Sequence, residues 1–338
     1  MVSAFDTVLM QKALDAAWAY QVLTFPNPAV GAVVSNDQGD ILGVGAHQKV
    51  GMPHAEVLAL KAAYERLTQD KRILKIEGAT ELHAFLKEHH NSLFHNLTLH
   101  VTLEPCHHFG RTPPCSGLID ALGIKRVVIG SFDDSEGAKG GGSFLQERGI
   151  EIVFGCLKAA CDLLLSPFTC KEKNRPFVFF KLAVSSNGVT TGGIITSLDS
   201  RNMVHRLRDR CDLLVIGGNT VRTDRPILDA RLCNGKAPNI LIYSKQKLFD
   251  LTIPLFNVPN RSVMIDETLN KINDYAMVMI EGGQSMLDAL SKEVEWYLIF
   301  ESPRAKEGEA IVLPQGLQKI FSQKVGEDTM SWYYKHAE

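Results

Sequence analysis

The chain has 338 residues, which at about 150 residues per domain predicts two domains. Its 36 Lys and Arg against 38 Asp and Glu give a net charge of −2, so a nucleic-acid binder that relies on a basic surface is not expected. An apolar fraction of 45% excludes a disordered chain, and no apolar run approaches the roughly 18 residues of a membrane span. The first twenty residues lack the basic start and apolar centre of a signal peptide. We therefore expect a cytoplasmic protein with neither a membrane nor a nucleic acid as partner.

Helices and strands alternate in the first half of the chain, which predicts a three-layer α/β/α domain over 1–150. The expected elements are a helix at 6–20, strands at 29–35 and 41–45 paired as a hairpin, a helix at 54–67, a strand at 98–104, a helix at 116–122 and a strand at 124–131. The glycine-rich stretch 135–143 lacks the spacing of a dinucleotide fingerprint, so we interpret it as a flexible loop.

A second α/β domain is predicted over 173–338, with 151–172 as a connecting segment that ends in the polar run 171–176. Its expected elements are a strand at 177–185, a helix at 199–211 and strands at 212–218, 239–244, 277–283 and 295–302.

Seven cysteines in a chain without a secretion signal argue against a disulfide framework. Five of them are expected to pack as small apolar residues. Cys106 and Cys115 are considered separately, because both lie in the segment 102–115 and can ligate a metal together with His54.

Three residues from two motifs can ligate a metal. His54 begins the motif His-Ala-Glu at a helix start, and Cys106 and Cys115 lie between a strand and a helix. One imidazole and two thiolates leave the fourth position of a tetrahedral zinc free for water, as in catalytic zinc sites. Helix N-termini favour the thiolate, and Cys115 begins a helix. We therefore predict a hydrolytic Zn²⁺ site.

Glu56 lies two residues after His54, close to the metal without being a ligand. Zinc lowers the pKa of its water to about 7, and a carboxylate there can carry protons to a ring nitrogen and to departing ammonia. His-x-Glu with Pro-Cys…Cys is typical of zinc deaminases that act on amino-substituted bases. The alternative is a structural zinc with His107 or His108 as fourth ligand, which would leave Glu56 without a role.

The segment 102–115, TLEPCHHFGRTPPC, resembles the bifunctional deaminase/reductase family of bacterial riboflavin biosynthesis. NPAVG at 27–31 and HxxxGxPHAE at 47–56 match that family as well. The resemblance implies a cytidine-deaminase-like first domain, a base pocket lined by Asn27 and His47, and His108 beside the metal. The family has a short connection where this chain has 66–97, and we interpret that insertion as a surface helix with solvated histidines at positions 83, 89, 90 and 95.

Glycines end two strands of the second half, at 217–218 and 282–283, where backbone amides can approach a phosphate. Ser244 and Lys245 follow another strand, and their hydroxyl and cation can hold the 2′-phosphate of NADPH. Each of these features is also compatible with an ordinary tight turn.

The order of segments in this half is similar to the reductase domain of the same family, which implies a dihydrofolate-reductase-like fold and NADPH as cofactor. By resemblance, the residues contacting NADPH are Ala183, Ile194, Thr220, Asp224, Ser244 and the loop at Gly283. Those contacting the ribosyl substrate are Arg208, Leu228, Arg231 and Glu281. Two arginines suit a phosphate-bearing substrate, because a guanidinium offers a planar pair of donors.

The chain departs from the family at four positions of the second half. Asn187 and Val189 stand where the family has an acid and an arginine, Ile194 where it has a tryptophan, and Arg225 where it has a second acid. Hydride transfer depends mainly on positioning, so we still expect reductase activity.

Taken with the resemblance, the sequence predicts a homo-oligomeric enzyme whose substrates are small phosphoribosyl-pyrimidines. It would deaminate 2,5-diamino-6-(5-phosphoribosylamino)pyrimidin-4(3H)-one and then reduce the ribosyl group of 5-amino-6-(5-phosphoribosylamino)uracil. The alternatives are a deaminase with a non-catalytic second domain, a non-catalytic zinc module, and a nucleic-acid deaminase. The last is disfavoured by the net charge and by the eight residues between the two cysteines.

Overall fold

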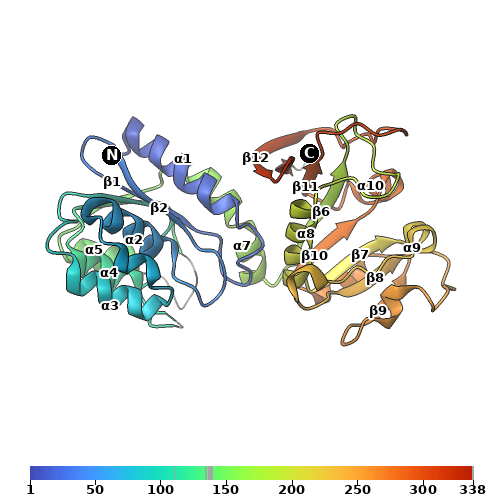
Figure 1. Ribbon diagram of the computed structural model, residues 1–338, viewed down its shortest axis with the longest axis horizontal. Helices are drawn as coiled ribbons and strands as arrows, with labels where there is room; N and C mark the ends of the chain where they lie inside the picture. The colour runs from blue at the N-terminus through green and yellow to red at the C-terminus, as the bar shows by residue number, and fades with distance from the viewer. Residues whose placement is uncertain (111, 134, 136–139, 337–338) are drawn as a thin grey trace. The chain divides into compact units, whose positions relative to one another are not determined.

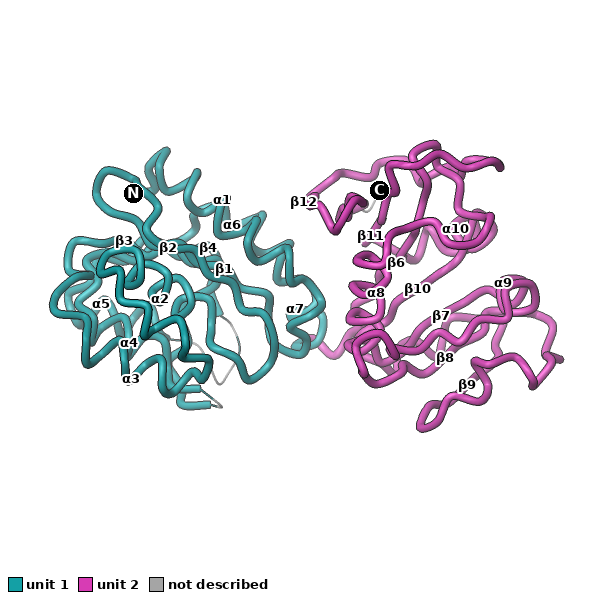
Figure 2. Tube along the Cα trace, in the orientation of Figure 1, with its two compact units in different colours: residues 1–172 teal, residues 173–338 magenta. Residues whose placement is uncertain are grey.

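The computed structural model describes residues 1–336 except 111, 134 and 136–139, and it divides into two compact units, 1–172 and 173–338 (Figure 1, Figure 2). Part of the expected glycine-rich loop lies outside the described residues, and a helix begins at Gly141. Within the described parts of the chain, none of the helices combines the length and the apolar character that crossing a membrane requires.

The first unit alternates helices and strands as predicted. Its elements are, in chain order, α1 (Ala4–Trp18), β1 (Gly31–Ser35), β2 (Ile41–Ala46), α2 (Ala55–Thr68), the 3₁₀ helix η1 (Lys71–Lys75), α3 (Ala79–His89), β3 (Thr98–Leu103), α4 (Cys115–Leu122), β4 (Arg126–Ser131), α5 (Gly141–Glu147), β5 (Glu151–Phe154), α6 (Lys158–Leu164) and α7 (Ser166–Glu172).

The sheet of this unit is covered by helices on both faces. Over the described residues its strand order is β2-β1-β3-β4-β5, with β1 antiparallel to β2 and β3, and β3, β4 and β5 parallel. Ala32 and Val34 of β1 join the core beneath α2 and α4, whereas His100 of β3 faces α1 and bonds Asp6 there at 2.9 Å. Figure 1 shows α1 on one face and α2 to α5 on the other. The three-layer prediction is confirmed.

Helix α2 lies directly against β2 because that strand carries glycines where the two elements touch. A Cβ atom at Gly43 would collide with the backbone of Ala59, and one at Gly45 with the backbone of Ala55 and Ala59. The close approach fixes the start of α2, and His54 is the residue that precedes its first turn.

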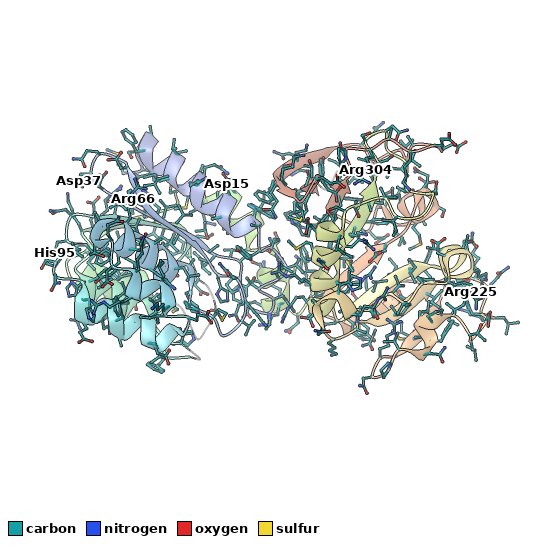
Figure 3. The ribbon with its side chains drawn as sticks, in the orientation of Figure 1. Asp15, Asp37, Arg66, His95, Arg225 and Arg304 are labelled. Atoms are coloured by element: carbon teal, nitrogen blue, oxygen red, sulfur yellow. The ribbon has the colours of Figure 1, made fainter. Side chains whose placement is uncertain are left out.

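The insertion 66–97 forms η1 and α3, and part of the prediction made for it is wrong. His95 is exposed (Figure 3) and His89 and His90 are half-buried, but His83 is only 4% exposed. The buried residues of α3 are Ala79, Leu82, His83 and Leu86. This spacing places His83 on the apolar face that packs against the first unit, instead of in solvent.

The expected connecting segment 151–172 is folded and belongs to the first unit. Its strand β5 extends the sheet beside β4. Gln21 donates a hydrogen bond to the carbonyl of Leu164 at 2.7 Å, and the hydroxyl of Ser131 bonds the Asp162 carboxylate of α6. These contacts tie the segment to the domain that precedes it.

The second unit is built on a mixed sheet. Its elements are β6 (Phe177–Val184), α8 (Leu198–Arg210), β7 (Leu213–Gly217), α9 (Gly218–Asp224), η2 (Arg231–Cys233), β8 (Asn239–Tyr243), η3 (Pro254–Asn257), β9 (Val263–Asp266), η4 (Asn270–Asp274), β10 (Met277–Glu281), α10 (Gln284–Leu290), β11 (Trp296–Glu301), β12 (Leu317–Val325) and β13 (Asp328–Lys335).

The strand order over the described residues is β12-β13-β11-β6-β10-β7-β8-β9. The strands from β11 to β9 are parallel, and the hairpin of β12 and β13 runs antiparallel beside β11. The carboxyl ends of parallel strands meet at one edge of a sheet, where open α/β sheets bind ligands. The strand ends at Val184, Gly217, Tyr243 and Glu281 therefore lie along a common edge.

Candidate active sites

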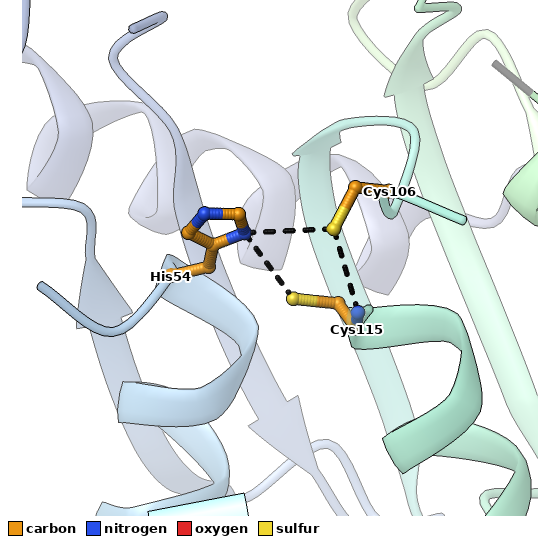
Figure 4. A group of neighbouring side chains, drawn as sticks. All are labelled: His54, Cys106 and Cys115. Atoms are coloured by element: carbon orange, nitrogen blue, oxygen red, sulfur yellow. Dashed lines mark hydrogen bonds between the residues drawn. The ribbon is translucent and has the colours of Figure 1, made fainter. Parts of the chain in front are cut away.

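His54, Cys106 and Cys115 come together at the start of α2 and α4 (Figure 4). Nδ1 of His54 lies 3.6 Å from Sγ of Cys106 and 3.4 Å from Sγ of Cys115, and the three ligand atoms all lie within 4.8 Å of one another. Tetrahedral zinc bonds of about 2.0 Å to nitrogen and 2.3 Å to sulfur separate the two atom types by about 3.5 Å. The spacing of the three side chains therefore fits zinc.

The protonation of the two thiols also fits a cation. Hydrogen bonds from Cys115 and His54 lower the pKa of Cys106 to about 4 against the effect of burial. The same Cys106 neighbour and burial raise the pKa of the Cys115 thiol. Two adjacent thiolates are stable together only with compensating positive charge, which a divalent metal supplies.

Glu56 lies in the first turn of α2, 4% exposed and beside the cluster. Burial raises the pKa of its carboxyl, although the nearby His54 opposes the shift. A buried carboxyl with a raised pKa holds a proton more readily than an exposed one, which suits a general acid–base group.

A cavity of about 520 Å³ lies over this cluster, and it is lined by the other residues predicted for the first site. His47 packs edge-on against His54 with ring centroids 5.4 Å apart. Its Nδ1 faces the Pro53 carbonyl at 3.2 Å and its Nε2 faces the Asn27 amide at 3.3 Å. Burial, and then the charge of His54, lower the pKa of His47 to about 4, so it is neutral at pH 7. His108 is exposed and lines the same cavity.

Several residues that line this cavity were not identified from the sequence, and four of them carry a charge or come from a distant helix. Glu104 accepts hydrogen bonds from the backbone amides of Gly142 at 2.8 Å and Asp133 at 3.3 Å. Burial raises the pKa of Asp133. The other two, Phe168 and Glu172, come from α7. Glu104 directly precedes Pro-Cys, which was a usable signal, whereas α7 reaches the cavity only through the tertiary fold.

In the second unit, two residues predicted to contact the cofactor line one cavity of about 310 Å³ at the sheet edge. Thr220 of α9 and Ser244 after β8 lie there together with Lys245 and the Gly217-Gly218 turn. Helix α10, which follows Gly283, contributes Ser285, Met286 and Ala289 to the same cavity.

The other predicted cofactor residues are placed elsewhere in the unit. Ala183 is half-buried in β6, Asp224 is exposed at the end of α9, and Ile194 is 68% exposed. Gly283 precedes α10 without lining the cavity itself. The described residues therefore bring Thr220 and Ser244 together but leave Ala183, Ile194 and Asp224 outside this cavity.

The residues predicted for the ribosyl substrate meet around Asp229. Arg208 donates to the Glu281 carboxylate at 2.9 Å and to the Asp229 carbonyl at 3.3 Å. Arg231 donates to the Asp229 carboxylate at 2.6 Å, and Leu228 is the residue before Asp229. Burial alone would raise the pKa of Glu281, but the charges of Arg208 and Lys181 lower it.

Lys181 is a further charged residue of this group that was not identified. It pairs in register with Glu281 across β6 and β10, and its Nζ lies 3.7 Å from the Glu281 carboxylate. Burial lowers its pKa. A lysine inside the apolar strand FVFFKLAV was the sequence signal for it.

The structure accounts for two departures from the family. Val189 is fully buried and forms a β-bridge with Ala310, so an arginine in its place would bury a charge. Oδ1 of Asn187 accepts from the Ser185 hydroxyl and from the backbone amide of Lys306, while its Nδ2 donates to the Lys306 carbonyl at 2.9 Å. An amide makes both kinds of contact, whereas a carboxylate only accepts.

Comparisons with known proteins agree with both halves of this description. Residues 3–131 match the family model of the cytidine and deoxycytidylate deaminase zinc-binding region. The riboflavin biosynthesis protein RibD of Aquifex aeolicus is 35% identical over 295 residues, covering 85% of this chain and 74% of that relative. RibD of Corynebacterium ammoniagenes is 31% identical over 314 residues, covering 87% of this chain and 85% of the relative.

A solved structure covers both units. A diaminohydroxyphosphoribosylaminopyrimidine deaminase/5-amino-6-(5-phosphoribosylamino)uracil reductase from Thermotoga maritima aligns with a TM-score of 0.61 and 25% identity, over 98% of this chain and 99% of that one. A zinc-binding deaminase fold followed by a reductase fold defines a bifunctional deaminase and reductase. The chain belongs to the RibD family of riboflavin biosynthesis proteins. The predicted family, fold class and pair of enzyme activities are confirmed.

Proposed function

We propose that the first unit deaminates 2,5-diamino-6-(5-phosphoribosylamino)pyrimidin-4(3H)-one and that the second reduces the ribosyl group of the resulting 5-amino-6-(5-phosphoribosylamino)uracil to ribityl. The observation that carries this proposal is the convergence of His54, Cys106 and Cys115 beside buried Glu56 in one cavity. In this proposal each compact unit carries one activity, the deaminase in 1–172 and the reductase in 173–338.

In the first unit, His54, Cys106 and Cys115 would hold Zn²⁺, which when bound supplies Lewis-acid activation of a water molecule at neutral pH. The Glu56 carboxylate would accept a proton from the water and pass it to the ring nitrogen. It would then take the proton of the newly added hydroxyl, which becomes the carbonyl, and deliver it to the amino group that leaves as ammonia. Asn27 and the neutral His47, which bond each other, would orient the pyrimidine. His108 would contact the substrate at the mouth of the cavity.

In the second unit, C1′ of the ribosyl group would take up a hydride, which NADPH supplies when bound, while its bond to the ring oxygen breaks and that oxygen takes up a proton. Thr220 and Ser244 would contact the cofactor, with Lys245 near its 2′-phosphate, in the cavity that they share. Ala183, Ile194, Asp224 and Gly283 stay predictions for the same cofactor. Arg208, Leu228, Arg231 and Glu281 would position the ribosyl phosphate substrate, because they meet around one loop.

Replacement of Glu56 by Gln tests the deaminase assignment. We expect ammonia release to fall by at least about 100-fold, the usual contribution of a general acid–base group, while the zinc content measured by metal analysis stays at the wild-type level. Glu88→Gln changes an exposed glutamate of the same unit and serves as the matched control. NADPH oxidation with the deaminated substrate reports the second unit in the same samples. Full ammonia release by Glu56→Gln would overturn the assignment.

We also propose a cytoplasmic location. None of the seven cysteines, all of which lie among the described residues, forms a disulfide, which suits a reducing compartment. Of the five outside the metal cluster, four are buried as predicted and Cys233 is half-buried. The homo-oligomer stays a prediction.

A further inference from the structure

Arg261 is a half-buried arginine whose hydrogen bonds go to main-chain carbonyls of two other segments. One terminal nitrogen, Nη1, donates to Leu228 at 2.8 Å, and the other, Nη2, donates to Ile227 at 2.5 Å and to Leu255 at 2.7 Å. Nε donates to Leu255 as well, at 3.2 Å. The guanidinium therefore joins the loop after α9 to the 3₁₀ helix η3.

The loop that Arg261 holds has a backbone conformation that needs support. Leu228 has a φ of +56°, in the left-handed region that non-glycine residues rarely adopt, and its side chain is buried. The carbonyls of Ile227 and Leu228 both point to the guanidinium. A further bond from the Leu255 amide to the Pro226 carbonyl, at 3.0 Å, fixes the start of the same loop.

The held loop leads directly to the residues proposed for the ribosyl substrate. Asp229 follows Leu228, and it bonds Arg208 through its carbonyl and Arg231 through its carboxylate. A displacement at Leu228 would therefore disturb the contacts that both arginines make with Asp229, and Arg208 also bonds Glu281.

The surroundings of Arg261 do not favour its positive charge. Burial lowers its pKa to about 10, Asp229 opposes that shift, and the like charge of Arg208 adds to it. A planar guanidinium offers five donors in a fixed fork and can satisfy three carbonyls at once, which a lysine ammonium on a flexible stem cannot do in the same geometry.

We propose that Arg261 is a positioning residue of the reductase site, which holds the loop 226–231 so that Leu228 and Arg231 face the ribosyl phosphate substrate. The inference rests on the proposed reductase function. It assigns to Arg261 no contact with the substrate or with NADPH.

The test measures both activities and cofactor binding in the full chain with Arg261→Lys and Arg261→Met. We expect the KM for the deaminated substrate to rise at least tenfold in Arg261→Met and less in Arg261→Lys. The Kd for NADPH and the kcat/KM for deamination should stay within about twofold of wild type. Arg304→Met is the matched control, because Arg304 is an exposed arginine of the same unit that pairs with Glu327 (Figure 3).

An unchanged KM in both variants would overturn the proposal, and so would an equal loss of NADPH affinity. Thermal unfolding of the second unit is followed in parallel. If Arg261→Met no longer shows that unfolding transition, the KM of Arg261→Lys tests the proposal instead. Loss of the transition in both variants would show that Arg261 acts in folding only, and would overturn the proposal. A wild-type enzyme that fails to oxidise NADPH with the deaminated substrate would contradict the proposed function itself, whatever the variants do.

Discussion

Nε2 of His54 lies 3.3 Å from the hydroxyl oxygen of Thr112, while Nδ1 of the same ring faces the sulfurs of Cys106 and Cys115. The nitrogen of the ring that faces away from the sulfurs thus contacts a residue of the same segment that carries both cysteines. Metal-ligating histidines usually bond a second residue through the nitrogen that does not face the metal, which sets the tautomer and the ring orientation. Thr112 has this relationship to His54.

Replacement of Thr112 by Val should therefore weaken zinc binding while leaving all three proposed ligands in place. Loss of such a supporting contact typically reduces metal affinity by about 10- to 100-fold. The measurement is competition for zinc with a chromophoric chelator. Thr112→Ser keeps the hydroxyl and should retain affinity close to that of wild type. Equal affinities in Thr112→Val and wild type would show that the ring is oriented by packing alone.

The difference between Thr112 and the three proposed ligands shows what the sequence could predict in this site. His54, Cys106 and Cys115 each stand in a short motif at the start of a helix or after a strand, so local structure already brings them near the sheet edge. Thr112 acts on a residue 58 positions away, and only the path of the chain between Cys106 and Cys115 decides which hydroxyl reaches His54.

Separation along the chain explains most of the other features that the sequence did not predict. The clamp by Arg261 joins residues 33 and 34 positions apart through irregular backbone, which has no periodic signal. The hairpin of β12 and β13 was not predicted, because β12 carries many exposed polar side chains such as Gln318 and Lys319. His83 is different: its spacing with Leu82 and Leu86 already indicated the buried face of α3, and only its polar character suggested solvent.

His83 should make the first unit sensitive to acid. Neither ring nitrogen has a hydrogen-bond partner among the described residues, and burial, followed by the charge of Lys87, lowers its pKa to about 4. In the unfolded chain a histidine titrates near 6.5. As the pH falls, the unfolded state takes up the proton first, so the contribution of neutral His83 is complete above pH 6.5 and is lost between 6.5 and about 4.

The corresponding variant is His83→Leu, which keeps the buried volume and removes the titration. We expect the free energy of unfolding at pH 7.5 to rise by about 1 kcal/mol, because an unsatisfied buried polar group is removed. Between pH 6.5 and 4, the free energy of unfolding should fall less steeply in the variant than in wild type. The difference between the two slopes is at most about 1.4 kcal/mol per pH unit, the contribution of one titrating group. His47 and His205 have pKa values lowered to about 4 as well, so the pH dependence is flattened and not abolished.

Urea denaturation at pH 7.5 and 5.5 measures both effects. His95→Leu, which replaces an exposed histidine of the same insertion, should leave the pH dependence unchanged. A His83→Leu variant that is less stable than wild type at both pH values would show that the imidazole has a stabilising partner.

Asn187 offers a test of how this chain compensates for its departure from the family. Asn187→Asp keeps an acceptor for the Ser185 hydroxyl and the Lys306 amide, but it brings a carboxylate oxygen against the Lys306 carbonyl in place of a donor. The lost hydrogen bond is exposed, so we expect a cost of only about 1 kcal/mol in holding the segment 303–311 against the turn after β6. That turn lies between Ala183 and Ile194, two residues predicted to contact NADPH. The Kd for NADPH should therefore rise about fivefold while deamination stays unchanged.

Fluorescence titration with NADPH measures the change in Kd caused by Asn187→Asp. The control is Asn273→Asp, which removes an amide donor to a carbonyl in the exposed 3₁₀ helix η4 of the same unit. Should Asn187→Asp bind NADPH as tightly as wild type, the family's acid at this position would be compatible with the fold of this chain, and the amide would not be what holds the two segments together.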